Sequence, residues 1–256
     1  MYIILSPHFD DAPFSCGGII HTLTAAGQQV EVRTIFGSIP TPDNVPDTPI
    51  TRDLHQRWAA GADPVAVRAA EDEAAILQLG ASYRRMAAYA DCVYRCSRSG
   101  LALYPDEESL FGEVHPDDMA ARLLPTVALP PEPFVAEVYA PLAAGHHVDH
   151  QIVRDWGFNL WQYRSALTVK FYEDYPYTRD EAAVEAALRA FAPLSLRPEI
   201  TELSEEAVIA KLNAIRCYRS QMSTFWPDDA TMEAETRAML NAVGGGRPAE
   251  RCWVPG

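Results

Sequence analysis

SPHFDD, at residues 6–11, lies between a short apolar run at 2–5 and the glycine pair Gly17-Gly18. The apolar run predicts a buried first strand, and the apolar segment 19–26 that the glycines open predicts a helix. One histidine and two carboxylates therefore lie on a turn at the C-terminal end of a strand. Open α/β sheets bind ligands at that edge, and imidazole together with carboxylate suits zinc or a similar divalent metal.

A second histidine cluster, GHHVDH at residues 145–150, follows another strand-like run. If the two strands belong to one parallel sheet, both turns open on the same edge of it, however far apart they are in the sequence. His8 and Asp11 are three residues apart and can hold one ion from two sides. His147 and His150 have the same spacing, so one of them can be the third ligand and the other a proton donor.

A metal site of this kind activates water, and a nearby carboxylate can take the proton of that water. Asp10 is placed to do so, and Asp149 can hold the free imidazole charged. The simpler alternative is that Asp10 and Asp11 cap the following helix and that the second cluster is a polar loop. Because the two clusters follow separate strands and have matching spacing, we favour the metal site.

A third run, HPDD at residues 115–118, repeats part of the first motif. No strand precedes it and no glycine pair follows it. It stands before a helical segment, where aspartate is a natural cap, so we assign it no chemistry.

The rest of the chain alternates strands with helices. Strands are predicted at 29–36, 83–89, 134–139 and 167–172, an extended segment at 199–203, and helices at 65–79, 117–129, 149–164, 180–191 and 204–221. This alternation predicts an α/β fold in which a mostly parallel sheet is flanked by helices. We expect one Rossmann-like domain over residues 1–256, with the active site at the C-terminal edge of the strands.

Two segments lack a clear pattern. Residues 37–64 are rich in Pro, Thr and Asp and have no sustained apolar period, so we predict a long loop. This loop either covers the active site or is a surface insertion. Residues 241–256, which include three consecutive glycines, are expected to form a loosely structured tail.

The composition limits the partners of the chain. Its net charge of −14 argues against a nucleic acid or an anionic membrane, since both call for a basic surface. No apolar run reaches the roughly 18 residues of a membrane-spanning helix, and no basic leader precedes the first strand, so we expect a cytoplasmic protein. The five cysteines are scattered without the spacing of a metal site, which favours free thiols. The sequence leaves open whether the chain is a monomer or a homo-oligomer.

The combination of the two clusters resembles the LmbE-like, or PIG-L, family of metal-dependent N-deacetylases. The resemblance covers roughly residues 2–225 and extends to Arg68–Gly80, Asp91, Tyr172–Tyr177 and Lys211–Gln221. Tyr172–Tyr177 follows a strand on the same edge and can line the pocket. The helical spacing of Lys211–Gln221 favours core packing instead.

The resemblance implies a role for each residue of the two clusters. His8, Asp11 and His150 would bind zinc, or ferrous iron in the cell. Asp10 would be the general base that activates the attacking water. His147 would be the charged partner that stabilises the oxyanion and protonates the leaving amine.

Three more residues receive roles through the resemblance. Asp149 would orient the imidazole of the charged partner, and Arg68 and Asp91 would hold the substrate. The last two have simpler alternatives, because Arg68 can pair with Glu71 or Asp72 on its own helix and Asp91 can be a turn residue.

The chain departs from the common family pattern at three positions. Phe9 and Val148 each replace a proline, and Ala12 replaces a glutamate. None of these changes removes an expected ligand. They indicate a subgroup that looks like the deacetylases of glycopeptide-type and other amino-sugar pathways.

Together these features predict a zinc-dependent hydrolase that removes an N-acyl group, with acetyl as the expected group, from an amino sugar or sugar conjugate. One alternative is a metal-dependent amidase that acts on another acylated amine or on a thiol conjugate. Another is a non-catalytic module that binds a nucleotide or sugar, in which Gly17-Gly18 would open a phosphate-binding helix. Two full His/Asp clusters would have no purpose in such a module.

Overall fold

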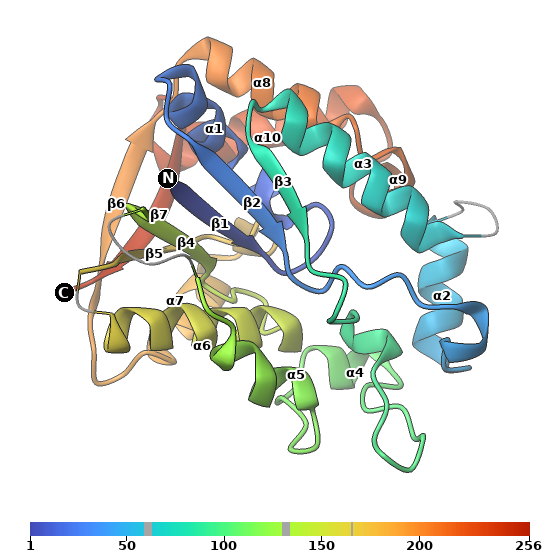
Figure 1. Ribbon diagram of the computed structural model, residues 1–256. Helices are drawn as coiled ribbons and strands as arrows, with labels where there is room; N and C mark the ends of the chain where they lie inside the picture. Colours follow the sequence, from blue (N-terminus) through green and yellow to red (C-terminus); the bar gives the residue numbers. More distant parts are fainter. Residues whose placement is uncertain (59–62, 130–133, 165) are drawn as a thin grey trace.

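A seven-stranded sheet forms the centre of the protein, with the strands in the order β3-β2-β1-β4-β5-β7-β6 (Figure 1). The computed structural model describes residues 1–58, 63–129, 134–164 and 166–256. β1 to β5 run parallel, and β7 runs antiparallel to both β5 and β6. The strands are β1 Tyr2–Ser6, β2 Val30–Thr34, β3 Ser82–Arg85, β4 Glu137–Pro141, β5 Thr168–Tyr172, β6 Leu196–Glu202 and β7 Ala249–Pro255.

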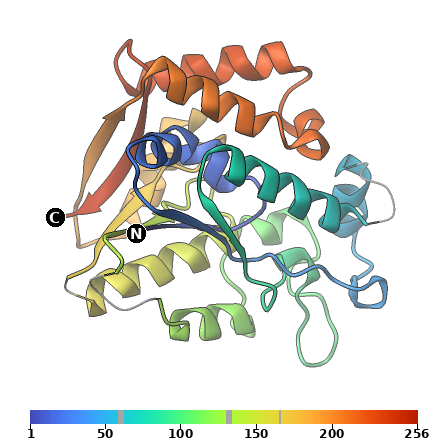
Figure 2. The same cartoon turned by 45° about the horizontal axis from the view of Figure 1, so that its top comes forward.

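Helices cover both faces of this sheet (Figure 2), which confirms the predicted Rossmann-like α/β fold. Side chains alternate along the strands, so Ile4 and Tyr139 pack toward α1, α3, α8 and α10, whereas Ile3 and Val138 pack toward α5, α6 and α7.

The helix predicted at 204–221 is two helices, α8 and α9. None of the helices within the described ranges has the length and apolarity to cross a membrane. The helices are α1 Asp11–Ala25, α2 Pro49–Trp58, α3 Pro64–Gln78, α4 Glu107–Leu110, α5 Met119–Leu123, α6 Val148–Tyr163, α7 Glu181–Arg189, α8 Glu205–Ile215, α9 Arg219–Phe225 and α10 Asp229–Val243.

The predicted loop at 37–64 is wrong in its second half, which contains helix α2. The hydroxyl of Thr48 accepts the N–H of Thr51 at 3.2 Å, and Pro49 takes the first helical position. Threonine and proline count as loop residues by composition, yet these are the two positions at which they begin helices. Residues 59–62 of the predicted loop lie outside the described residues.

A separate apolar cluster lies beside the C-terminal edge of the parallel strands. Ile50 and Trp58 of α2 pack there with Phe9 from the turn after β1, and with Val93 and Leu110 from the segment between β3 and β4. The long connections after β2 and β3 thus share a core of their own. This packing holds them next to the turn that carries the first histidine.

The predicted loose tail at 241–256 is wrong as well. Helix α10 continues to Val243, a glycine turn follows, and β7 then enters the sheet between β5 and β6. Gly245 and Gly246 have φ angles of 64° and 105°, which glycine adopts without strain. The pairing partners of β7 come from distant parts of the chain, so the local composition of the tail does not reveal the strand.

The first helix begins earlier than predicted, at Asp11, and the glycine pair lies inside it. A Cβ atom on Gly18 would lie 2.4 Å from Leu203 Cδ1, and one on Gly17 would lie 3.1 Å from Lys211 Cγ. The pair therefore lets α8 and Leu203, two residues before it, approach α1 closely.

Helix α1 is kinked at Cys16, whose φ and ψ are −133° and 27°. A kink leaves backbone groups without their usual partners inside the helix, and buried groups of this kind need partners elsewhere. The N–H groups of Gly18 and Ile19 donate to the carboxylate of Glu250 at 3.0 and 2.7 Å. A side chain of β7 thus accepts the hydrogen bonds of the N–H groups that begin the second half of α1.

Lys211 of α8 completes this arrangement. Its ammonium group donates to Glu250 at 2.7 Å and to the carbonyl oxygen of Phe14, before the kink, at 2.5 Å. The Lys211 side chain is fully buried and that of Glu250 is 2% exposed. The ion pair joins both halves of α1, and the first half carries Asp11.

Candidate active site

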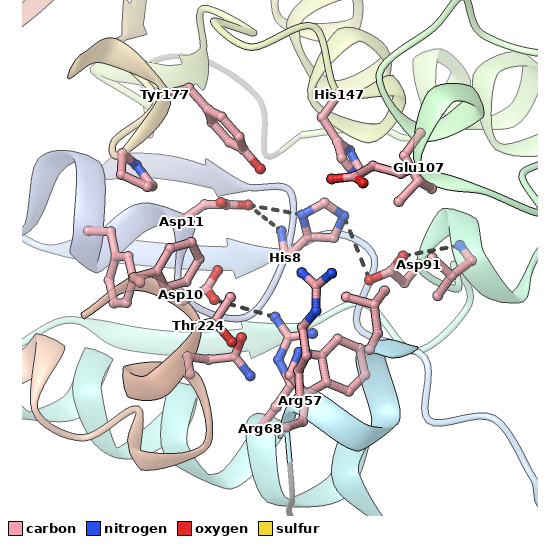
Figure 3. Close-up of a pocket in the computed structure, with 18 of the residues that line it drawn as sticks. His8, Asp10, Asp11, Arg57, Arg68, Asp91, Glu107, His147, Tyr177 and Thr224 are labelled. Atoms are coloured by element: carbon pink, nitrogen blue, oxygen red, sulfur yellow. Dashed lines mark hydrogen bonds and ion pairs between the residues drawn. The ribbon is translucent and has the colours of Figure 1, made fainter. Parts of the chain in front are cut away.

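The two histidine clusters meet at the C-terminal edge of the sheet (Figure 3). The strands β1 and β4 are parallel neighbours, so the turn after β1 lies beside the start of α6 after β4. The ring centroid of His8 lies 4.9 Å from that of His147 and 5.3 Å from that of His150. Parallel pairing therefore brings together the residues that the sequence analysis selected from two distant segments.

Hydrogen bonds of Ser6 close the first turn. Its hydroxyl donates to the carbonyl oxygen of His8 at 2.9 Å and accepts the N–H of Ala12 at 3.0 Å. The N–H of His8 also donates to the carboxylate of Asp11 at 2.7 Å. These bonds fold the turn so that an imidazole and a carboxylate lie next to each other.

The carboxylate of Asp11 lies at ligand spacing from both expected histidine ligands, and His8 and His150 also belong, with His147, to a group of buried side chains that could hold a metal ion. Oδ2 of Asp11 lies 3.3 Å from Nδ1 of His8 and 3.3 Å from Nε2 of His150. Neighbouring ligands of a tetrahedral ion lie about 3.3–3.4 Å apart when each bond is about 2.0–2.1 Å long. The two nitrogens and one carboxylate oxygen are also the donor types that zinc prefers, so the expected ligand set fits a divalent metal.

Carboxylates hold the remaining nitrogen of both imidazoles. Nδ1 of His150 donates to Asp174 at 2.6 Å, and Nε2 of His8 donates to Asp149 at 2.9 Å. This pattern selects the tautomers that leave the facing nitrogens free for a metal. Burial by itself would lower the pKa of His150, but Asp11 and Asp174 raise it to about 10. The surplus of negative charge around the imidazoles also favours a cation.

The carboxylate of Asp149 does not contact the imidazole that the sequence analysis assigned to it. Besides His8, it accepts the N–H of Cys92 at 2.9 Å and the guanidinium of Arg95 at 2.5 Å. Only the backbone N–H of Asp149 reaches His147, where it donates to Nδ1 at 3.3 Å. The side chain of Asp149 thus positions His8 in this structure.

Asp10 has a strained backbone and a buried carboxylate. Its φ of 121° is rare for a residue with a side chain, and such strain is concentrated at functional sites. The side chain lines the same pocket as His8 and His147. Burial raises the pKa of Asp10 to about 7, although the charge of Arg68 opposes this shift. A carboxylate with a pKa near neutrality can both take and release a proton.

The imidazole of His147 caps helix α6. Its Nδ1 accepts the N–H of Asp149, so the proton of the neutral ring is on Nε2. Burial and the nearby positive charge of His8 hold the pKa of His147 well below its usual value. These effects favour a neutral ring, whereas the sequence analysis expected a charged one.

The chain matches the family described as GlcNAc-PI de-N-acetylase, or PIG-L, over residues 3–161. The chain belongs to the PIG-L family. The matched region contains both histidine clusters, from His8 to His150. Members of this family are N-deacetylases, which are hydrolases, so the expected enzyme class is confirmed.

Relatives of this PIG-L protein are similar over nearly its whole length. It is 32% identical to the 2'-N-acetylparomamine deacetylase of Streptomyces fradiae, covering 99% of this chain and 89% of that protein. It is 24% identical to the protein of the same name from Niallia circulans, covering 99% and 90%. The crystal structure of a zinc-inhibited form of teicoplanin deacetylase has the same fold, with a TM-score of 0.77, 22% identity, and coverage of 100% and 98%.

Arg68 of the PIG-L chain does not make the helix pairs that were its simpler alternative. Its guanidinium lies 3.4 Å from Asp10 Oδ2, donates to Phe9 O at 3.1 Å, and lies 4.4 Å from the ring centre of Trp58. Its Nε atom is buried and has no hydrogen-bond partner among the described residues. Asp91 lies across the pocket and reaches Nε2 of His8 at 3.9 Å.

The pocket of this PIG-L protein has a volume of about 270 Å³. Tyr175 and Tyr177 line it, as the sequence analysis expected of the segment after β5. Arg57 of α2 and Glu107 of α4 line it too (Figure 3), and no motif marked either of them. Both lie in the irregular connections after β2 and β3, where the sequence carries no periodic signal.

A network of buried charged side chains holds Asp149, the carboxylate that accepts a hydrogen bond from His8 of the PIG-L site. Arg95 bridges Asp149 and Asp118, the latter at 2.8 Å. Asp118 also caps α5 by accepting the N–H of Ala120, as predicted for the 115–118 run. Its second contact links that run to the candidate metal ligand, a role that the sequence analysis did not assign.

Replacing Arg95 by methionine is expected to weaken the affinity for zinc by about 10- to 100-fold, because Asp149 then loses the cation that fixes it behind His8. The affinity is measured by titrating the metal-free protein in competition with a chelator. Arg98→Met, at an exposed position of the same segment, is expected to bind zinc like the wild type. Unchanged affinity in Arg95→Met would show that Asp149 does not need this partner.

Proposed function

We propose that the chain is a divalent-metal-dependent N-deacetylase that removes an acetyl group from an aminoglycoside of the 2'-N-acetylparomamine kind. The main support is the 32% identity to a 2'-N-acetylparomamine deacetylase over 99% of the chain. A second relative with the same name matches over the same share of the chain.

The metal site follows from the donor set described above. His8, Asp11 and His150 would hold zinc or ferrous iron. When bound, the metal supplies a Lewis acid that makes water more acidic and polarises the acyl carbonyl.

The side chains of the pocket can then carry the protons of the reaction. Asp10 takes a proton from the water whose oxygen bonds to the acyl carbon. Nε2–H of His147 donates to the acyl oxygen as negative charge develops on it. Because this neutral ring has no second proton, Asp10 returns its proton to the sugar nitrogen as the C–N bond breaks. The products are acetate and the free amine.

The charge of the pocket supports an amino-sugar substrate that carries further amines. Among the described residues, four carboxylates line it, Asp10, Asp11, Asp91 and Glu107, against two guanidinium groups, Arg57 and Arg68, of which Arg68 is paired with Asp10. The net charge of the whole chain, −14, also attracts cationic molecules. A neutral monosaccharide would gain little from these charges.

The proposal is tested by measuring acetate release from three compounds by the metal-loaded protein. We expect the highest kcat/KM for 2'-N-acetylparomamine, a lower value for N-acetylglucosamine and none for an N-acetylated alkylamine. Protein in which His8 and His150 are both alanine serves as the metal-free blank. Faster release from the alkylamine would favour the amidase alternative, and no release from any compound would contradict the deacetylase proposal.

The non-catalytic alternative depended on free N–H groups after the glycine pair. The N–H groups of Gly18 and Ile19 are both bound by Glu250 in the interior. A phosphate group has no access to these donors, so this alternative loses the feature that suggested it.

A further inference from the structure

Glu107, the first residue of α4, lines the pocket but takes no part in the proposed reaction. Figure 3 shows its side chain reaching from α4 toward the middle of the pocket. Among the described residues, it is one of four carboxylates in the lining. It differs from the other three in its lack of a partner within this part of the protein.

The other three carboxylates are held by protein groups. Asp10 lies 3.4 Å from Arg68, and Asp11 lies 3.3 Å from both expected histidine ligands. Asp91 accepts a backbone N–H at 3.2 Å. Over the described ranges of the chain, the carboxylate of Glu107 has neither a hydrogen bond nor an ion pair. The fold therefore leaves this charge available to a ligand.

The guanidinium groups of the pocket do not neutralise Glu107. Arg68 is paired with Asp10, and Arg57 is paired with Asp53 on its own helix at 2.5 Å. Both positive charges thus have partners of their own. A cation that enters the pocket finds Glu107 unpaired.

The helical spacing of α4 turns Glu107 toward the pocket. The carboxylate of Asp106 caps this helix. Glu107, Leu110 and Phe111 stand at positions i, i+3 and i+4, which share one face of a helix, and all three line the pocket. Leu110 also packs into the apolar cluster beside the sheet edge, which anchors that face. Glu108 lies outside the lining.

Glu107 lies at the outer part of the pocket. It is exposed, whereas the side chains of His8 and Asp11 are only 11% and 12% exposed. In the proposed function the acetylated nitrogen of the substrate must reach these inner residues. A second ring attached to the acetylated sugar therefore lies farther out, where Glu107 is.

We propose that Glu107 binds an ammonium group on the second ring of the substrate and thereby selects N-acetylated amino sugars that carry a further free amine. This inference rests on the proposed function for the position of the acetyl group. Glu107 belongs to none of the groups of side chains in the described ranges that could hold a metal ion. An organic cation is therefore its expected partner.

The strength of this contact follows from its setting. A hydrogen bond between an ammonium and a carboxylate is stronger than one between neutral groups, because both partners are charged. Water at the exposed end of the pocket weakens the attraction. The contact should therefore change the preference between substrates without being essential for the reaction.

The kinetic test compares kcat/KM for 2'-N-acetylparomamine, which has free amines on its second ring, with kcat/KM for N-acetylglucosamine, which has no second ring. We expect the ratio of these two values to fall about five- to tenfold in Glu107→Gln. Glu108→Gln removes the neighbouring charge outside the lining and should keep the wild-type ratio. An unchanged ratio in Glu107→Gln, or an equal fall in Glu108→Gln, would overturn the proposal.

Direct binding separates this inference from the proposed function. Paromamine has no acetyl group to lose, so it can be titrated into the metal-loaded protein and its Kd measured by calorimetry. We expect Glu107→Gln to raise this Kd about five- to tenfold and Glu108→Gln to leave it unchanged. If no acetylated compound is hydrolysed, the proposed function fails, and this titration still decides whether Glu107 binds the cation. A wild type that does not bind paromamine, or that binds it no better than Glu107→Gln does, would contradict the role of Glu107.

Discussion

Replacing Asp10 by asparagine is expected to lower kcat by about 10²- to 10⁴-fold while the protein keeps its metal. The amide has the shape of the carboxylate but cannot take a proton from water. Asp10 is not among the expected ligands and belongs to none of the groups of possible metal ligands in the described part of the chain, so the metal site should remain intact. The rate is measured as acetate release and the metal content by elemental analysis of the same sample.

Two comparisons make this result specific. His8→Ala/His150→Ala should lose both the metal and the activity, because it removes two of the three ligands. Asp117→Asn changes a carboxylate outside the pocket and should leave both unchanged. If Asp10→Asn turned over at the wild-type rate, another group would have to be the base. If it lost its metal, Asp10 would belong to the ligand set.

The sequence was sufficient to predict the meeting of the two histidine clusters. Each cluster follows a strand, and parallel strands end on the same edge of a sheet. Proximity between His8 and His150 therefore follows from local patterns and one rule of topology. The positions of Asp10 and Asp11 in the same turn follow from their place in the sequence.

The supporting residues could not be predicted in the same way. Asp174, Arg95 and Asp118 reach the site through side-chain contacts between elements that are distant in sequence. Such contacts depend on the angles between packed elements, and no periodic pattern records those angles.

Backbone elements were missed for a related reason. Helix α2 was hidden by Thr48 and Pro49, residues that break helices internally but begin them at the N-terminus. Strand β7 is stabilised by partners on β5 and β6. In both cases the local composition predicted an irregular segment. The position of Thr48 and Pro49 at the start of α2, and the pairing of β7 with two other strands, produce a helix and a strand instead.

The buried ion pair between α8 and β7 gives the largest expected effect on stability. Lys211→Met should lower the free energy of unfolding by about 3–5 kcal/mol, because it leaves the carboxylate of Glu250 buried without its cation. The carbonyl oxygen of Phe14 also loses its donor. The change is measured by urea denaturation of the metal-free protein, so that metal binding does not add to the difference.

The chain provides a matched control, since Lys170 is its only other lysine. Lys170 pairs with Glu137 and Glu199, whose side chains are 24% and 38% exposed, so water can reach the carboxylates that Lys170→Met leaves unpaired, and this change should cost less than Lys211→Met. Glu250→Gln combined with Lys211→Met should cost less than the two single changes added together, because no unpaired charge then stays in the interior. Since the pair joins both halves of α1, equal stability of Lys211→Met and the wild type would mean that packing around the glycine pair holds the kink by itself.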